Sequence, residues 1–377
     1  MRTIGLTVTL AVLGLAAASA PTSARQTSRA AAAKPAVQRP AAKAGIPRTP
    51  DGHPDLQGNW SNATITPLER LRPNTPLVLT EEAAKADEVN TQKALDAREG
   101  PSSPDRPAPP VGGENRKSPN AEPTYLERLW AFGGGAVGGY NSFWIDPGDR
   151  VLRVDGQPRS SILIDPPNGR VPGLTPAAQA RAAKAAEIRK TQGSEFDQPE
   201  LRPLGERCIT SFGSNAGPPM LPNYFYNNNY SIAQSKDTVM ILTEMVHDAR
   251  MVRIGGQHPP AGLRKWFGDS IGKWEGDTLV IETTNFYEGN AFRGAWENLK
   301  VTERLGRRDA TTLSYRFTVE DPTSFTAPFS GELEFHAMPP GEMVYEYACH
   351  EGNYGLEGVM SGARAAERDA AKKKSQQ

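Results

Sequence analysis

The second half of the chain alternates between apolar and polar residues with a period of two, and this pattern constrains the fold most. It is clearest over residues 312–320, where Leu313, Tyr315, Phe317 and Val319 lie on one face and polar residues lie between them. Because successive side chains of a β-strand point to opposite faces, the pattern predicts a strand with one buried face.

Similar segments separated by turn residues predict a series of antiparallel strands from residue 230 onward. The predicted strands span residues 231–234, 238–244, 249–254, 278–286, 299–305, 312–320, 330–336 and 344–349. Such a series is typical of an up-and-down β-barrel or a strongly curled, lipocalin-like meander, and a two-sheet sandwich is the alternative. A barrel of about eight strands holds one small ligand or is filled by its own side chains.

The rest of the chain predicts shorter elements around this β domain. Thr80 is placed to cap a helix from 81 to about 97, and Thr175 to cap one that continues over 177–190. Short strands are predicted at 143–145, 151–154 and 161–164. We therefore expect a mainly β protein with an N-terminal wrapping region and two peripheral helices.

The first 20 residues have the features of a secretory signal peptide. Arg2 precedes an apolar run that is too short to cross a bilayer, and small residues follow it. Cleavage after Ala20 is expected, although Pro21 is unfavourable there and a site as late as Ala24 is the alternative. We thus expect an exported protein, periplasmic or extracellular, without a transmembrane segment.

Composition divides the mature chain into four further segments. Residues 21–45 are rich in Ala, Pro and basic residues and predict a disordered linker. Residues 46–200 form the wrapping region, 201–365 the β-barrel domain, and 366–377 a charged disordered tail. The 43 basic residues equal the 43 acidic ones, so no global field favours nucleic acid.

The two cysteines, Cys208 and Cys349, predict a disulfide, because an even set in an exported chain is usually paired. Two free thiols are the alternative. The bond would close a loop of about 140 residues and stabilise the fold by about 5 kcal/mol. It would join the start of the β domain to its last predicted strand.

Polar residues gather in four places that are candidates for chemistry or binding. The four groups are Glu206 and Arg207 beside Cys208; Asn227, Asn228, Asn229 and Tyr230; Glu244, His247, Asp248 and Arg250; and His350, Glu351, Gly352, Asn353 and Tyr354. The disulfide would bring the first group near the fourth, and the second and third flank the first two predicted strands. All four groups are therefore expected to meet at one mouth of the barrel.

The third group is the most suggestive for catalysis. His247 lies at a turn between two predicted strands, and histidine titrates closest to neutral pH. A neighbouring carboxylate, Glu244 or Asp248, would orient it for acid–base work, and Arg250 would bind an oxyanion. The alternative is a hairpin turn with a salt-bridging arginine.

His350 and Glu351 form the second candidate catalytic pair, and the alternative there is a chain end held by the disulfide. Asn228, Tyr230, Glu206, Arg207, Asn353 and Tyr354 are candidate substrate-binding residues. No HxH or HExxH spacing supports a metal site, so no cofactor is predicted, with a divalent metal as a minor alternative. His53, His258 and His336 are isolated and are interpreted as surface or turn residues.

Several segments resemble a family of uncharacterised secreted bacterial proteins. The segments are GHPDLQGNW (52–60), LGERC (204–208), NNNY (227–230), EMVHDAR (244–250), GKWEGDTLVIETTNF (272–286), FRG (292–294) and YACHEGNY (347–354). The resemblance extends from about Gly52 to Ala365 and implies export and a shared architecture. The likeness of the meander to lipocalin-like barrels is an analogy of fold.

Two classes of function remain open from the sequence. The first is a metal-independent hydrolase, lyase or isomerase that acts on a small organic or glycosidic substrate through His and carboxylate residues. The second is a non-catalytic, lipocalin-like binding protein of the envelope. A structural envelope module becomes the leading hypothesis if apolar side chains fill the barrel interior.

Overall fold

The protein was analysed as a computed structural model, which describes residues 45–71, 74–99, 147–211, 217–223 and 226–376. The predicted signal peptide, nearly all of the predicted linker, the glycine-rich segment 132–139 and the predicted strand 143–145 lie outside these residues. The described part is mainly β and contains three α-helices.

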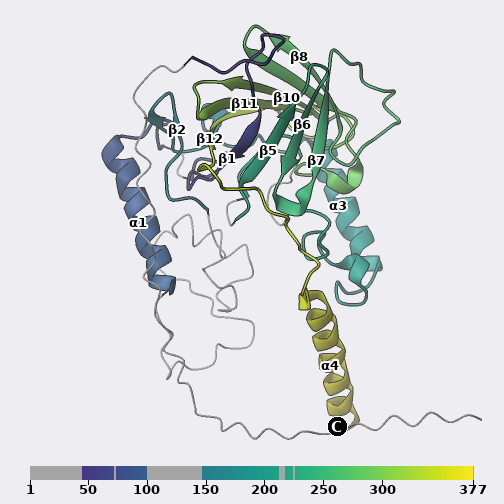
Figure 1. Cartoon of the computed structure of the whole chain (residues 1–377). Coiled ribbons are helices and arrows are strands. Elements are labelled where there is room, and N and C mark those ends of the chain that lie inside the picture. The colour runs from purple at the N-terminus through teal and green to yellow at the C-terminus, as the bar shows by residue number, and fades with distance from the viewer. Residues whose placement is uncertain (1–44, 72–73, 100–146, 212–216, 224–225, 377) are drawn as a thin grey trace, which may run out of the picture. The chain divides into compact units, whose positions relative to one another are not determined.

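Nine strands form a closed barrel, which confirms the mainly β, barrel-type prediction (Figure 1). The strands are β1 (Gly58–Ser61), β5 (Asn229–Gln234), β6 (Thr238–Thr243), β7 (Ala249–Ile254), β8 (Asp269–Glu275), β9 (Thr278–Thr284), β10 (Lys300–Arg307), β11 (Thr312–Glu320) and β12 (Phe329–Ala337). They follow one another in this order around the barrel, and β1 closes it by pairing with both β5 and β12. A short strand, β4 (Leu163–Asp165), adds to β12, and β2 (Arg153–Val154) and β3 (Gln157–Pro158) form a separate hairpin.

One pair of strands departs from the up-and-down topology. Strands β7 and β8 are parallel, with Val252 opposite Ser270, whereas every other pair in the barrel is antiparallel. Parallel neighbours need a crossover connection, and residues 255–268 provide it. The sequence missed β8, because its residues, DSIGKWE, do not alternate between apolar and polar.

Seven of the eight predicted barrel strands are present, and the bounds of β7 and β11 agree with the prediction. The predicted strand at 344–349 is wrong: these residues form no strand. The physical reason is that β12 already pairs with β11 and with both β1 and β4. Closure by β1 therefore leaves no free edge of β12 for a further strand.

Inward-facing side chains of the described strands fill the barrel. Trp60, Tyr230, Tyr315, Phe317 and Phe335 are each at most 1% exposed. The predicted inward face of β11 is confirmed, since its alternate residues from 313 to 319 are buried. On β12, Gly331 makes room for the Phe317 ring, because a Cβ atom there would lie 2.5 Å from it.

A charged pair lies inside this apolar interior. Arg250 of β7 donates two hydrogen bonds to Glu303 of β10, at 2.5 and 2.9 Å, and the side chains are 5% and 0% exposed. The Tyr315 hydroxyl donates to the same carboxylate at 2.9 Å. Burial and the charge of Glu303 raise the pKa of Tyr315, so the phenol remains a proton donor. Both terminal nitrogens of Arg250 and both oxygens of Glu303 are thus hydrogen-bonded, while the buried Nε atom of Arg250 has no hydrogen-bond partner.

The segment from Gly217 to Asn223 packs into the core next to this pair. Met220 and Leu221 belong to the apolar cluster and are almost fully buried. The Met220 backbone N–H donates to the Tyr315 hydroxyl at 2.8 Å, and the Tyr230 hydroxyl donates to the Leu221 carbonyl at 3.1 Å. Interior polar groups therefore fix a segment that is not itself part of the sheet.

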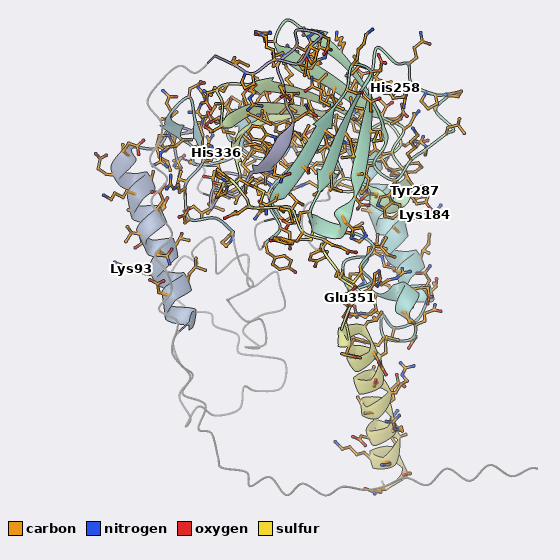
Figure 2. The ribbon with its side chains drawn as sticks, in the orientation of Figure 1. Lys93, Lys184, His258, Tyr287, His336 and Glu351 are labelled. Carbon is orange, nitrogen blue, oxygen red and sulfur yellow. A yellow bond between two sulfur atoms is a disulfide. The ribbon has the colours of Figure 1, made fainter. Side chains whose placement is uncertain are left out.

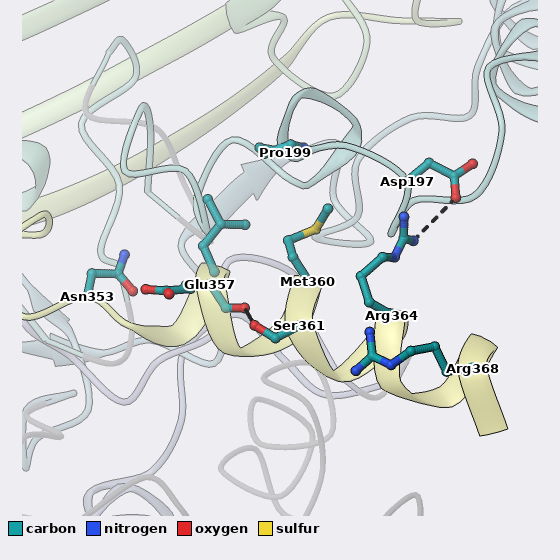
Figure 3. Close-up of a pocket in the computed structure, with 9 residues that line it drawn as sticks. Asp197, Pro199, Asn353, Glu357, Met360, Ser361, Arg364 and Arg368 are labelled. Carbon is teal, nitrogen blue, oxygen red and sulfur yellow. Dashed lines mark hydrogen bonds and ion pairs between the residues drawn. The ribbon is translucent and has the colours of Figure 1, made fainter.

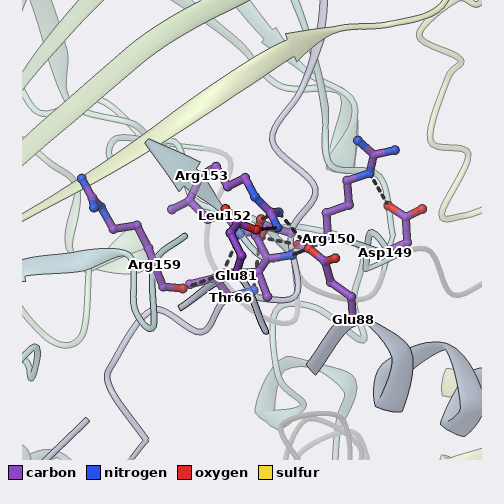
Figure 4. Close-up of polar contacts among 10 residues, drawn as sticks. Thr66, Glu81, Glu88, Asp149, Arg150, Leu152, Arg153 and Arg159 are labelled. Atoms are coloured by element: carbon purple, nitrogen blue, oxygen red, sulfur yellow. Dashed lines mark hydrogen bonds and ion pairs between the residues drawn. The ribbon is translucent and has the colours of Figure 1, made fainter. Parts of the chain in front are cut away.

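Helix α1 (Glu81–Glu99) begins after the predicted cap, because the Thr80 hydroxyl accepts a hydrogen bond from the Ala83 N–H. Figure 4 shows how it contacts β2: Arg153 pairs with Glu81 at 2.9 Å and with Glu88 at 2.8 Å. Ala84, which is fully buried, packs against Ile65 and Val151. The helix is thus attached by one apolar contact and a small ionic network.

Helix α3 (Pro176–Thr191) has the predicted Thr175 cap. Helix α4 (Gly355–Ser375) was not predicted: residues 366–375, expected in a disordered tail, are helical. The described residues thus contain three helices where two were expected. The propensity of Ala, Arg, Glu and Lys favours the helix, and the prediction gave too much weight to charge.

Among the described residues, no helix is both long enough and apolar enough to span a membrane.

We expect Glu303→Gln to destabilise the protein by about 3–5 kcal/mol, because it leaves the buried Arg250 charge uncompensated. The matched control is Glu275→Gln, at an exposed carboxylate that pairs with Lys273 and Arg304, with an expected loss of about 0–1 kcal/mol. Urea unfolding monitored by fluorescence measures both. Equal losses in the two variants would contradict the role given to the buried pair.

Candidate functional site

The turn between β6 and β7 holds its residues in an unusual backbone conformation. Val246 and His247 have φ angles of 62° and 48°, in the left-handed region. That region is unfavourable for any residue with a Cβ atom and especially for a β-branched one. Strain of this kind costs about 1–3 kcal/mol per residue and tends to occur at functional sites, so the turn is a candidate site.

Hydrogen bonds from the flanking strands hold the turn. Glu244 is 6% exposed and accepts a hydrogen bond from the Asn229 amide at 2.9 Å. Its backbone N–H donates to the Asn229 carbonyl at 3.0 Å, and the Thr243 N–H donates to the Asp248 carbonyl at 2.9 Å. Glu244 is therefore a support of the turn, with its carboxylate directed at the neighbouring strand.

His247 contacts the C-terminal segment of the chain. Its Nδ1 atom lies 3.2 Å from the carbonyl oxygen of Tyr347, and the Tyr347 ring stacks on Tyr226 with centroids 6.2 Å apart. The His247 side chain is otherwise exposed. We call Asn229, Glu244, His247, Asp248 and Tyr347 the turn cluster.

Asp248 titrates close to neutral pH. Burial raises the pKa of its carboxyl group from 3.8 to about 6, and the charge of His247 opposes this shift. The carboxyl group is only partly buried. The turn cluster therefore contains an acid that exchanges its proton in the same pH range as an ordinary histidine.

The predicted disulfide is confirmed between Cys208 and Cys349. It brings the first polar group next to the fourth, as expected, and the Asn353 amide lies 3.3 Å from the Cys208 sulfur. Cys349 does not lie in a strand, so the bond joins two loops. Tyr347, two residues before Cys349, contacts His247 of the third group.

The predicted binding residues of the first group make contacts within the protein. Glu206 accepts two hydrogen bonds from Arg202, both at 2.8 Å. Arg207 donates to the Glu200 carbonyl at 3.3 Å. These contacts fix the loop that carries Cys208.

Three further predicted site residues have buried side chains. Asn228 is 2% exposed and accepts a hydrogen bond from the Asn223 N–H at 2.7 Å. Tyr230 and Arg250 point into the barrel, where they contact Leu221 and Glu303 respectively. The structure thus places these three residues in the core, away from the exposed imidazole of His247.

The second candidate pair, His350 and Glu351, lies on an exposed segment together with Asn353 and Tyr354. Figure 2 shows Glu351 on the stretch that leads to α4. The Asn353 side chain accepts a hydrogen bond from the Gly355 N–H at 3.2 Å. His350 and Glu351 are therefore exposed residues between Cys349 and α4.

A groove of about 770 Å³ follows α4 and includes Asn353 in its lining. Figure 3 shows Arg364 of α4 directed at Asp197, with a separation of 3.6 Å. Arg364 also donates to the Phe196 carbonyl at 2.9 Å. These contacts attach the first part of α4 to the loop at 196–199.

The sequence missed a second cluster, which surrounds Asp269 at the start of β8. The Asp269 side chain is 0% exposed and accepts hydrogen bonds from Arg253 at 2.8 and 2.8 Å, from Lys265 at 2.5 Å and from His258 at 2.9 Å. Hydrogen bonds from these three residues, that of Arg253 foremost, hold the pKa of Asp269 far below its usual range despite burial.

His258, interpreted from the sequence as an isolated residue, therefore has an acidic partner. A signal for this cluster was present in the sequence. The predicted strands left residues 255–277 unassigned, and a long connection without structure of its own is uncommon in a compact domain unless it has a function.

Among the described residues, no three His, Cys, Asp or Glu side chains are arranged to hold a metal ion.

Comparisons with protein-family models, with curated proteins and with solved structures found no match to this chain. The fold places the protein among the closed β-barrels: it has nine strands, mostly antiparallel, and a disulfide.

The raised pKa of Asp248 predicts that folding stability falls as pH rises from about 4 to about 6. In this window the folded state binds more protons at Asp248 than the unfolded state, and the loss is complete at about pH 7, where the folded carboxyl is also deprotonated. Asp248→Asn should remove this loss and therefore be more stable than the wild type at about pH 7, with no advantage below about pH 4.

A ¹³C NMR titration of the carboxyl group checks the cause directly, with an expected midpoint of about 6. A midpoint near 4, or a stability advantage of Asp248→Asn that does not change with pH, would contradict this assignment.

Proposed function

We propose that this protein is an exported enzyme that uses the turn cluster for metal-independent acid–base chemistry on a small organic or glycosidic substrate. The reaction class is that of a hydrolase, lyase or isomerase, with His247 as the base and Asp248 as its acidic neighbour. The observation that carries the proposal is the Nδ1 contact of His247 with the Tyr347 carbonyl.

This contact determines which nitrogen of His247 can act as a base. A carbonyl oxygen only accepts hydrogen bonds, so Nδ1 must carry the proton and donate it. In the neutral imidazole, Nε2 is then the basic nitrogen, and the ring is held in one orientation. A fixed tautomer with an accessible basic nitrogen is what a general base needs.

Asp248 supplies the second titrating group. Since its carboxyl has a pKa of about 6, it is partly protonated in the range where a histidine changes charge. A carboxyl group whose raised pKa lets it keep its proton at higher pH than an ordinary carboxyl can serve as a general acid beside a histidine base. The exposed side chain of His247 makes the pair accessible to a substrate from solution.

The backbone and the disulfide support the same proposal. The left-handed conformations of Val246 and His247 persist because the Asn229–Glu244 contacts and the Tyr347 segment hold the turn from both sides. The Tyr347 carbonyl is positioned two residues before Cys349, which the disulfide ties to Cys208. Disulfides persist in oxidising compartments, which agrees with the predicted leader and with export.

The alternative, a non-catalytic lipocalin-like binding protein, needs space inside the barrel for a ligand. Side chains of the described strands occupy that interior, with Trp60, Tyr315, Phe317 and Phe335 almost fully buried. The turn cluster, by contrast, lies at the end of β6 and carries an exposed histidine, His247, and a partly exposed carboxyl group, Asp248. The filled interior argues against a carrier with a central cavity and leaves two hypotheses, a structural envelope module and an enzyme with its site at the rim. We favour the enzyme because the turn cluster places an exposed histidine beside a partly exposed carboxyl group.

We expect His247→Gln to lower kcat/KM by at least about 100-fold on any substrate that the purified protein turns over, because it removes the general base. A panel of chromogenic esters and glycosides provides the screen. Asp248→Asn should lower activity less and should change the pH profile between about 5 and 7.

His336→Gln, on β12, is the matched control for a histidine outside the turn cluster, and its activity should equal that of the wild type (Figure 2). If His350→Ala abolishes turnover while His247→Gln retains it, the chemistry belongs to the C-terminal segment and the proposal is wrong. Turnover that His247→Gln, Asp248→Asn and His350→Ala all retain would also refute it.

A further inference from the structure

The crossover loop between the parallel strands covers Asp269 on the outer face of the barrel. Cross-strand partners share a face. Asp269 is opposite Thr284, and the next residue, Ser270, is opposite the inward-facing Thr283. Asp269 therefore faces outward, and residues 255–268 bury it. The turn cluster precedes β7 and this loop follows β7, so the two places are separate.

A groove of about 480 Å³ opens along this loop. Its lining includes Arg253, Pro259, Leu263, Arg264, Lys265 and Asp269. Three of these side chains are cationic and one is anionic. Because the anion is fully buried while Arg253 and Lys265 are 38% and 56% exposed, the groove presents positive charge outward.

Contacts within the protein hold these three cationic side chains in place, and some of their N–H groups remain available to a ligand. Arg253 donates to the two oxygens of Asp269 from Nη1 and Nη2, and Nη2 also donates to the Gln257 carbonyl at 2.9 Å. Lys265 uses one of its three N–H groups on Asp269. Arg264 lies over the Trp296 ring at 4.7 Å and donates from one nitrogen to the Phe286 and Glu297 carbonyls. Groups that are fixed before binding lose little entropy when a ligand arrives.

The nearby Glu282 does not cancel this charge. It lies 3.4 Å from the Nε2 atom of His258, an ion-pair distance without hydrogen-bond geometry, and it is not part of the groove lining. The apolar part of the lining is Pro259 with Leu263, which is 61% exposed. The groove thus combines fixed cationic donors with an exposed apolar wall.

We infer that this groove binds a small organic anion, with its carboxylate or phosphonate-type oxygens on Lys265, Arg264 and Arg253 and its apolar part on Leu263. The charge-assisted hydrogen bonds supply affinity, since they are about twice as strong as neutral ones. The buried Asp269 orients the cations and takes no part in contacting the ligand.

Isothermal titration calorimetry of the full chain with phenylphosphonate tests this inference. We expect saturable binding that Lys265→Met and Arg264→Gln each weaken by about tenfold, as for the loss of one charge-assisted hydrogen bond. The matched control is Lys273→Met, at an exposed lysine of β8 that pairs with Glu275, and it should bind as the wild type does. Benzyl alcohol, which lacks the anion, should bind much more weakly.

Raising the salt concentration tests the charge requirement on the unaltered chain, so the result does not depend on whether a variant folds. Binding should weaken markedly between about 50 mM and 500 mM NaCl, because salt screens exposed charges. Absence of saturable binding by the wild type, equal binding of benzyl alcohol, or affinity unaffected by both Lys265→Met and salt would each overturn the inference.

Discussion

Closure of the barrel by β1 is the constraint on which the rest of the structure depends. This strand has only four residues, yet it pairs with β5 on one side and with β12 on the other. Without it both neighbours would present unpaired backbone groups, which are costly in an exposed sheet edge. Trp60 places its ring inside the barrel and is 1% exposed, so the same strand supplies both the last hydrogen bonds and a large part of the filling.

A closed and filled barrel determines where function can lie. The interior accommodates the Arg250–Glu303 pair because the charges compensate each other and Tyr315, which itself accepts a hydrogen bond from the Met220 N–H, donates a further hydrogen bond to Glu303. Polar residues that a sequence pattern assigns to a binding site, such as Tyr230, become part of this core. The two candidate sites therefore use titratable groups outside the barrel interior. One site is the turn cluster at the rim of the barrel, and the other is the groove over Asp269 on its outer face.

The two candidate sites share one physical principle. Each contains a feature that is unfavourable by itself. In the first it is the left-handed backbone at His247, and in the second it is the buried carboxylate of Asp269. Neighbouring groups offset these costs, through the Tyr347 carbonyl in one case and through Arg253 and Lys265 in the other. Sites that are organised before binding have less entropy to lose when a ligand arrives.

The sequence by itself determined the β-rich class, seven of the barrel strands, the caps of two helices and the cysteine pair, because these depend on local periodicity and on a short list of residue types. It also indicated His247 and Asp248, since a titratable pair at a turn is visible locally. Tertiary structure alone decided that β1 closes the barrel, that β7 and β8 run parallel, and that residues 344–349 form no strand. It also decided which polar residues are buried and that Asp269 gathers three basic partners, because such contacts join residues far apart in the chain or depend on which face of a strand is covered.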